Sequence, residues 1–295
     1  NVRPIGGWTK YTSSALNGQP MSMHAWKTNG NKEVLAVGTR TKLYVLFNAV
    51  WTDITPTSFV TPNTNAALGF GAYNYGVEDY GDARSQSGLQ SDFDIWSLDN
   101  WGEELVACCS SDGRLLKWNP NTGGTADTIS AAITNAPTGC RGLIVTNERH
   151  LVALGASSDP RKVQWSDSEN YTTWTPAATN AAGSLQLRTK GRITGAERWQ
   201  TDILLFTTNG LHRMYYQGQP FVYGIQKAGE SIGAIGKESI VNTSGFMVWM
   251  TENGFVLYDG TVKPLECPVH DFIFDNLNRP LVTAPNGLFK LSKIK

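Results

Sequence analysis

The chain has 295 residues, with 25 Lys or Arg and 25 Asp or Glu, so its formal net charge is zero. Charged residues make up 17% of the chain and the sequence pI is about 7.1, which excludes a basic nucleic-acid-binding protein as a description of the whole chain. Aromatic residues reach 11%, which argues against disorder, and no apolar run approaches the roughly 18 residues of a membrane helix. The many Gly, Asn, Thr and Trp residues favour strands and turns over helices.

One pattern recurs five times along the chain: a hydrophobic strand, a tight polar turn and a second strand. In chain order these predicted hairpins cover residues 33–47, 104–118, 150–165, 202–216 and 246–260. Three turns contain Asp112-Gly113, Asn209-Gly210 or Asn253-Gly254, pairs that favour the left-handed backbone of a type I′ turn. Turn centres at Thr41, Asp112, Asp159, Asn209 and Asn253 are 71, 47, 50 and 44 residues apart. Three of these four separations match the repeat length of propeller blades.

Each hairpin is flanked by shorter segments that can complete a four-stranded sheet. Half-polar segments precede the hairpins and predict inner strands at residues 21–26, 92–98, 141–146, 192–199 and 239–243. Further extended segments follow, and they predict outer strands at residues 51–58, 173–178 and 220–229. We therefore expect an all-β fold, a β-propeller of about five four-stranded blades in a closed or an incomplete ring, over residues 1–278 with a tail at 279–295. A β-sandwich is the competing fold, since short strands at regular spacing suit it as well.

The long first separation places an insertion within the predicted propeller, at about residues 57–91. Its centre is rich in Gly, Tyr, Asn and Asp and has no apolar period. Long loops of this kind are either solvated segments or functional arms. Phe70, Tyr73, Tyr75 and Tyr80 are aromatic anchors of the type found in interfaces, so they are the candidate subunit-interface arm.

A modest cluster of cations lies between the third and fourth hairpins. In a strand, Arg188, Lys190 and Arg192 would share one face and could follow a phosphate backbone, since such contacts require only positive charge. These three residues are the candidate DNA-channel contacts, and an ordinary solvent-facing strand is the alternative.

The residue types that carry catalysis or bind metals show no recognisable spacing. A phosphate-binding loop, a G-x-S-x-G elbow and an H-E-x-x-H pair are all missing from the sequence. The four histidines are far apart, and Cys108, Cys109, Cys140 and Cys267 form no C-x-x-C pair. We expect free thiols that pack as small hydrophobic groups, with no catalytic residues, no metal and no cofactor.

At the level of whole segments, the chain resembles the β-propeller tail proteins of tailed bacteriophages, namely tail nozzles and packaged-DNA stabilisation proteins. The segments that carry the resemblance, in order, are RPIGGWTKYTSSALNGQPMSMHAWKTN (3–29), LAVGTRTKLYVL (35–46), WTDITP (51–56), IWSLDNWGEELVAC (95–108), VQWSDSENYTTWTP (163–176), TGAERWQTDILLFTTNGLHRMYY (194–216) and MVWMTENGFVLYDGTVKPLECPVHDFIFDNLN (247–278). Each segment is short, so the resemblance depends on their order, and no catalytic set accompanies it.

The resemblance implies a non-enzymatic structural component of a phage virion tail, assembled in the cytoplasm of the bacterial host. It implies a cyclic homo-oligomer, with six copies around the DNA channel, that helps to retain or conduct the genome. Implied partners are an adaptor, a tail fibre and, without sequence preference, DNA in the lumen; membrane insertion is not expected.

Two alternatives of other classes stay open at this stage. A carbohydrate-binding propeller, as in a lectin or receptor-binding module, could use some of the ten tryptophans as stacking platforms, although blade packing also explains Trp26, Trp96, Trp118, Trp165 and Trp249. A glycosidase-like propeller would need carboxylates that converge in the central cavity.

Overall fold

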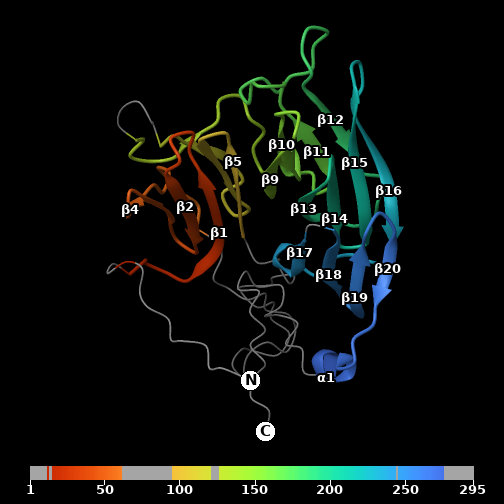
Figure 1. Ribbon diagram of the computed structural model, residues 1–295. Coiled ribbons are helices and arrows are strands. Elements are labelled where there is room, and N and C mark those ends of the chain that lie inside the picture. The colour runs from red at the N-terminus through yellow and green to blue at the C-terminus, as the bar shows by residue number, and fades with distance from the viewer. Residues whose placement is uncertain (1–11, 13–14, 62–94, 121–125, 244, 276–295) are drawn as a thin grey trace, which may run out of the picture.

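The computed structural model describes residues 12, 15–61, 95–120, 126–243 and 245–275 of the chain. These residues form five four-stranded antiparallel sheets, and within each sheet the strands follow the order of the chain. The sheets are arranged radially, with the first strand of each near the centre (Figure 1). The predicted β-propeller of five four-stranded blades is therefore confirmed. The described residues contain one α-helix, α1 (His270–Asp275), and two short 3-10 turns, η1 (Ala156–Ser158) and η2 (Lys237–Ser239).

The blades are numbered 1 to 5 along the chain. Blade 1 contains β1 (Pro20–Lys27), β2 (Glu33–Thr39), β3 (Leu43–Phe47) and β4 (Val50–Asp53), and blade 2 contains β5 (Trp96–Trp101), β6 (Glu104–Cys109), β7 (Leu115–Trp118) and β8 (Ala131–Ala132). Blade 3 contains β9 (Gly142–Val145), β10 (Leu151–Leu154), β11 (Lys162–Trp165) and β12 (Gly183–Gln186). Blade 4 contains β13 (Ile193–Trp199), β14 (Asp202–Thr207), β15 (Gly210–Gly218) and β16 (Val222–Glu230), and blade 5 contains β17 (Ile240–Asn242), β18 (Met247–Thr251), β19 (Gly254–Tyr258) and β20 (Val262–Leu265). All five predicted hairpins and all five predicted inner strands are confirmed within a few residues.

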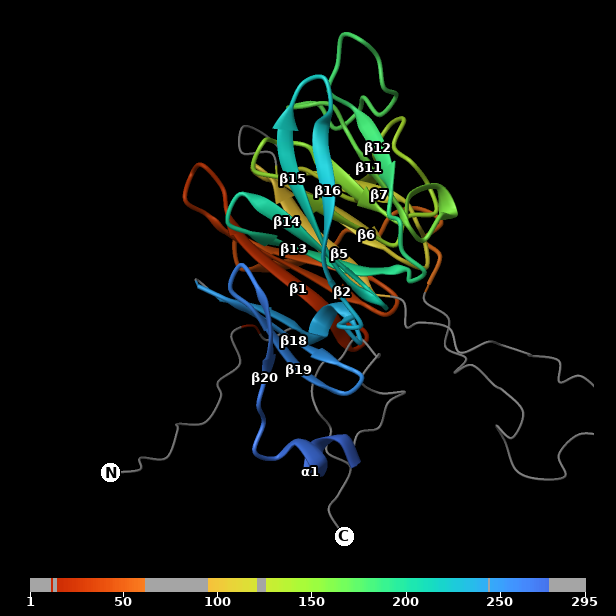
Figure 2. The same ribbon diagram turned by 90° about the vertical axis from the view of Figure 1, so that its right-hand side faces the viewer.

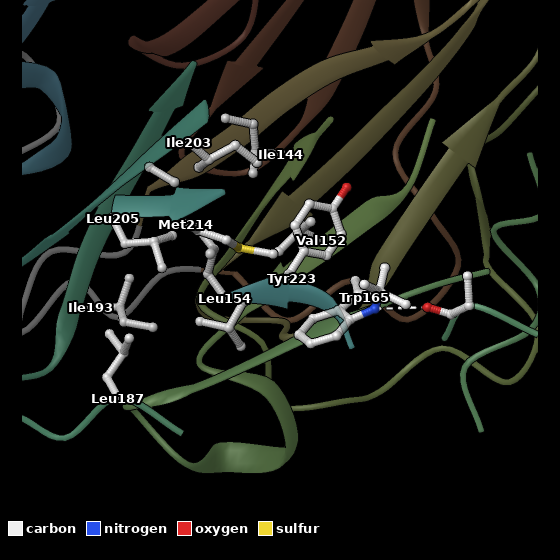
Figure 3. Close-up of a cluster of buried hydrophobic side chains, with 14 residues drawn as sticks. Ile144, Val152, Leu154, Trp165, Leu187, Ile193, Ile203, Leu205, Met214 and Tyr223 are labelled. Carbon is white, nitrogen blue, oxygen red and sulfur yellow. Dashed lines mark hydrogen bonds between the residues drawn. The ribbon is translucent and has the colours of Figure 1, made fainter. Parts of the chain in front are cut away.

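The hydrophobic core consists of apolar layers between neighbouring blades. Successive strand residues point to opposite faces, so a strand with apolar residues at every position packs against two neighbours. On β14, Ile203 and Leu205 pack toward blade 3, and Leu204 and Phe206 pack toward blade 5. Figure 3 shows the layer between blades 3 and 4, where Trp165 and Tyr223 lie among aliphatic side chains. Similar layers join blades 1 and 2, 2 and 3, and 4 and 5, and none joins blade 5 to blade 1 within the described residues.

Tryptophans and cysteines belong to these layers. The five tryptophans noted in the sequence are all buried, so their role in blade packing is confirmed; they are Trp26, Trp96, Trp118, Trp165 and Trp249. All four cysteines are free, and three are buried. Cys108 packs between blades 2 and 3, whereas Cys109 packs between blades 1 and 2. Burial raises the pKa of the Cys140 thiol to about 12, so this group stays protonated and packs as a hydrophobic side chain.

The predicted outer strand of blade 3 is wrong. Residues 173–178 form a loop, and the outer strand is β12, at residues 183–186. Trp174 enters the layer between blades 2 and 3, and its Nε1 donates to the Tyr171 carbonyl at 2.7 Å. The real strand begins with Gly183, where a Cβ would lie 2.4 Å from the Trp165 ring. Only glycine lets the strand approach this buried tryptophan.

The predicted type I′ turns are also wrong. Asn209, Asn253 and the glycines that follow them have ordinary backbone angles, and only Gly113, with a φ of 67°, takes a left-handed conformation. Threonine hydroxyls organise these turns instead, as in the local side-chain turns that Ser and Thr favour. Thr207 Oγ1 accepts a hydrogen bond from the Gly210 N–H at 3.0 Å, and Thr251 Oγ1 donates to the Gly254 carbonyl at 2.9 Å.

Gly38 marks the closest approach between blades 1 and 2. A Cβ at this position of β2 would lie 2.4 Å from two atoms of the Trp96 ring. We expect Gly38→Ala to lower the free energy of unfolding by about 1–3 kcal/mol, because a packed core resists added volume. Chemical denaturation measures the loss. Gly245→Ala is the control, since nothing lies within 4 Å of a Cβ there, and an equal loss in both variants would contradict the packing argument.

Candidate functional site

Polar side chains from three blades meet the backbone of a fourth near the centre of the propeller. They come from the inner strands β5 and β13 and from η2, which precedes the inner strand of blade 5. Blade 3 contributes the backbone of β9. We call this group the axial cluster, and its members are Ser97, Asp99, Glu197, Arg198, Lys237 and Glu238.

Ser97 and Asp99 are buried because they satisfy the free backbone edge of blade 3. The inner strand β9 pairs with β10 on one side only, and a buried backbone group without a partner is costly. Ser97 Oγ donates to the Leu143 carbonyl at 2.9 Å and accepts from the Leu143 N–H at 3.2 Å. Asp99 Oδ2 accepts from the Val145 N–H at 2.8 Å. The two side chains are two residues apart, so they face the same side of β5.

Two cations extend these contacts to blades 4 and 5. Arg198 of β13 donates from Nη2 to Asp99 Oδ1 at 2.6 Å, and Lys237 of η2 donates from Nζ to Ser97 Oγ at 2.9 Å. Both side chains therefore bind blade 2 although blade 3 lies between. Gly195 leaves room for Lys237, because a Cβ there would lie 3.1 Å from Lys237 Cγ. Asn242 of β17 donates to the Arg198 carbonyl at 2.7 Å, which links blade 5 to blade 4.

The remaining two members are carboxyl groups whose pKa is raised above the ordinary value. Burial raises the pKa of Glu197, and the positive charges of Lys237 and Arg198 oppose this shift. Partial loss of hydration also raises the pKa of Glu238, again against the influence of Lys237. The side chain of Glu238 is exposed even so, which means that solvent reaches the cluster on that side. Carboxyl groups with raised pKa beside cations are able to donate or accept a proton.

The raised pKa of Glu197 leads us to predict how the stability of the fold depends on pH. The folded-state pKa of Glu197 lies above the ordinary value of 4.5. Protonation of this group therefore stabilises the folded state, fully below pH 4.5, and this stabilisation is lost as the pH rises through the folded-state pKa. We expect Glu197→Gln to be more stable than the wild type at pH 7, with a difference that shrinks as the pH falls to 4. Urea denaturation at the two pH values measures it. A difference that is independent of pH would contradict the assignment.

The site residues predicted from the sequence lie elsewhere. Arg188, Lys190 and Arg192 are exposed, but they lie in the connection between β12 and β13 instead of in a strand. The predicted stripe on one strand face is therefore wrong. The connection bends at Gly191, where a Cβ would lie 2.6 Å from Thr208 Oγ1. The candidate interface residues Phe70, Tyr73, Tyr75 and Tyr80 lie outside the described residues.

The start of the insertion is held against blade 2. Ser111 Oγ donates to the Val60 carbonyl at 2.7 Å, and Arg114 donates to the carbonyls of Thr57 and Ser58. Phe59 stacks on Trp96 with ring centroids 5.2 Å apart. These contacts fix the point at which the insertion leaves the propeller.

In the part of the chain that the structure describes, no group of three His, Cys, Asp or Glu side chains could hold a metal ion. The same residues include no helix that is long and apolar enough to span a membrane.

Comparison with known proteins adds the following. No family model and no curated protein matches the chain. A streptogramin B lyase structure matches with a TM-score of 0.47 and 9% identity, over 82% of this chain and 68% of that one. A nidogen/laminin complex matches with a TM-score of 0.44 and 11% identity, over 77% of this chain and 71% of that one. At such identities the likeness concerns the fold.

These matches correct one expectation from the sequence. We expected a chain that is not an enzyme, but the propellers similar to it include a lyase. The expectation that the chain is not an enzyme, which rested on the missing motifs, is therefore wrong.

Proposed function

We propose that the chain is a structural component of a phage virion tail, of the nozzle or hub type, whose copies form a ring around the path of the DNA. The supporting resemblance consists of seven segments in the same order along the chain. The observation that carries the proposal is the axial cluster, which ties blade 2 to blades 4 and 5 and so makes the propeller a rigid block. A ring that withstands the internal pressure of packaged DNA needs subunits of this kind.

From the same cluster we propose a path for the DNA. Arg198 and Lys237 bridge the inner strands near the axis, so the centre of a single propeller is occupied by side chains. The major groove of a DNA duplex alone is about 12 Å wide, so the whole duplex needs an opening that an axis filled by side chains does not offer. We therefore propose that the lumen lies between several copies arranged in a ring and that no DNA passes through the axis of one propeller. A net charge of zero suits such a wall, since phosphate contacts from many cations would retain the DNA.

The proposed partners follow from this position. Copies of the chain contact each other around the ring, an adaptor lies on the side of the head, and a tail fibre is a further neighbour. Assembly takes place in the bacterial cytoplasm and the finished protein is part of the virion. Arg188, Lys190 and Arg192 are exposed and are proposed as contacts for DNA without sequence preference.

Labelling of assembled particles tests the proposal. A phage with an affinity tag on this chain is purified by density gradient, and tagged copies are located by electron microscopy with a gold-labelled antibody. The expected result is label at the tail, in several copies per particle. Purified, infectious particles that contain no tagged chain would contradict the proposal.

A second function has a specific observation in its favour. The charges of Asp99 and Glu238 both act on Glu197, so the three carboxyl groups belong to one region near the axis, and the pKa of Glu197 and of Glu238 is raised. A pair of carboxyl groups in different protonation states is the requirement for acid–base hydrolysis of a glycosidic bond. Glu197→Gln and Glu238→Gln should then abolish turnover of a glycoside panel that the wild type hydrolyses. No turnover by the wild type would remove this candidate.

The carbohydrate-binding alternative receives less support. It relied on tryptophans as stacking platforms, and the five tryptophans at strand positions are buried between blades. A buried ring cannot present its face to a sugar, so these residues supply no binding platform.

A further inference from the structure

Blade 5 has an apolar face that no other blade covers within the described residues. The side chains of β18 and β19 that pack toward blade 4 alternate with others that point to the opposite side of the sheet. On that side, Val248 of β18 is paired with Val241 of β17 and with Leu257 of β19. Phe255 of β19 is paired with Leu265 of β20 in the same way. We call these five side chains the open face.

The open face is accessible to solvent. Val241 is 58% exposed and Leu265 is 41% exposed, and the other three side chains are partly exposed. The neighbouring charged residue of β20, Lys263, is ion-paired with Asp259. On β6 of blade 2, in contrast, residues 105–109 are all buried, because blades 1 and 3 cover both sides of that sheet. Contiguous exposed apolar surface marks an interaction site, so we expect a partner for the open face.

The chain leaves the described residues beside this face. After β20 it forms α1, which lies below blade 5 in both views (Figures 1 and 2). Phe274 of α1 packs edge-on against Phe255 of the open face, with ring centroids 5.8 Å apart. His270 Nε2 lies 3.0 Å from the carbonyl oxygen of Asn253, in the turn between β18 and β19. Because α1 ends at Asp275, the residues that follow begin at the edge of the open face.

The sequence after α1 contains a segment with matching chemistry, although it lies outside the described residues. Residues 281–291 read LVTAPNGLFKL, with one charged side chain and with large apolar side chains at Leu281, Val282, Leu288, Phe289 and Leu291. Residues 276–295 contain four Lys or Arg and no Asp or Glu. The end of blade 5 beside α1 has exposed side chains of the opposite charge, namely Glu252, Glu266, Asp271 and Asp275. Opposite charges at the edge of an apolar contact favour association and fix its register.

We propose that residues 281–291 bind the open face of blade 5 of the same chain. The chain from Asp275 to Leu281 reaches at most about 20 Å, and a strand of five residues, such as β18 or β19, is about 17 Å long. The segment can therefore reach any part of the open face. Tethering gives it an effective concentration in about the millimolar range, which favours it over the same segment of another copy. The contact lies within one chain, so it does not depend on the proposed ring.

Hydrogen exchange of the full chain, followed by mass spectrometry, tests the contact. The amides of residues 281–291 are expected to exchange about tenfold or more slowly than in a free peptide of residues 279–295, because a bound segment exchanges only when it is released. Val241→Asp places a charge on the open face, and Phe289→Ser removes an apolar side chain from the segment. Each variant is expected to bring the exchange close to the rate of the free peptide.

Val50→Asp is the matched control, because Val50 is 61% exposed on blade 1 and does not belong to the open face. Val241 is also exposed, so its replacement should leave the propeller folded, and unchanged exchange of the β14 amides verifies this for each variant. Exchange of residues 281–291 at the free-peptide rate in the wild type would overturn the proposal, as would full protection of these residues in Val241→Asp.

Dilution of the wild type identifies the occupant of the open face. A segment bound to its own chain keeps its protection over about a hundredfold dilution, because its effective concentration is set by the tether. Protection that falls on dilution would assign the open face to a second copy, and protection seen only after another protein is added would assign it to that protein. Either result would overturn the proposal.

Discussion

Trp96→Ala is expected to lower the free energy of unfolding by about 3–5 kcal/mol, the range for removing a buried tryptophan side chain. Trp96 is completely buried between blades 1 and 2, where it contacts Gly38, and Phe59 stacks on its ring. Its Nε1 donates to the Thr39 carbonyl at 2.8 Å. Alanine would leave a cavity and also deprive that carbonyl of its donor, and both effects destabilise the fold.

A graded series separates the two effects. Trp96→Phe keeps most of the ring volume but has no N–H, so we expect a smaller loss of about 1–2 kcal/mol. Phe221→Ala removes a large aromatic side chain at an exposed position and should change the unfolding free energy by no more than about 0.5 kcal/mol. Urea denaturation followed by fluorescence measures all three variants. Equal losses for Trp96→Ala and Phe221→Ala would contradict the packing argument.

The architecture could be predicted from the sequence because a propeller repeats one local rule. Each hairpin consists of two apolar strands joined by a short polar turn, and this pattern is visible within fifteen residues, as in residues 33–47 and 104–118. The inner strands could be predicted because a half-polar segment lies within a few residues before each hairpin. Both features are local, so one sequence is enough to detect them.

The predictions that the structure contradicts concern features that depend on tertiary contacts. Residues 173–178 are extended in appearance, but burial of Trp174 between two blades keeps them in a loop. The Asn-Gly turns fold with ordinary backbone angles because the hydroxyls of Thr207 and Thr251 bind the turn instead. Neither competing interaction leaves a distinct pattern in the sequence.

The axial cluster was missed for a related reason. Asp99, Arg198 and Lys237 are separated by up to 138 residues in the chain, so only the closure of the blades brings them together. A weak signal did exist: Ser97, within the inner strand predicted at residues 92–98, and Asp99, just after its end, put polar side chains on one face, where apolar residues would be expected. Polar residues on the first strand of a blade indicate contact with the axis.

Asp99→Leu is expected to lower the free energy of unfolding by about 2–4 kcal/mol. The carboxylate is buried, accepts the Val145 N–H and faces Arg198. Leucine has a similar volume, so the loss reports a buried N–H without an acceptor and a cation without its partner. Arg198 is 40% exposed, and water therefore reduces the cost of leaving it unpaired. For this reason we place the expected loss below that of a fully buried ion pair.

Two further variants separate the backbone contact from the ion pair. Asp99→Asn keeps an oxygen that accepts the Val145 N–H but loses the charge, so it should cost about half as much as Asp99→Leu. Arg198→Leu should be costly in the wild type and nearly neutral in the Asp99→Leu background, because the two residues act as a pair. Additive losses in that double-mutant cycle would show that Arg198 stabilises the propeller without Asp99, and the bridge between blades 2 and 4 would not exist.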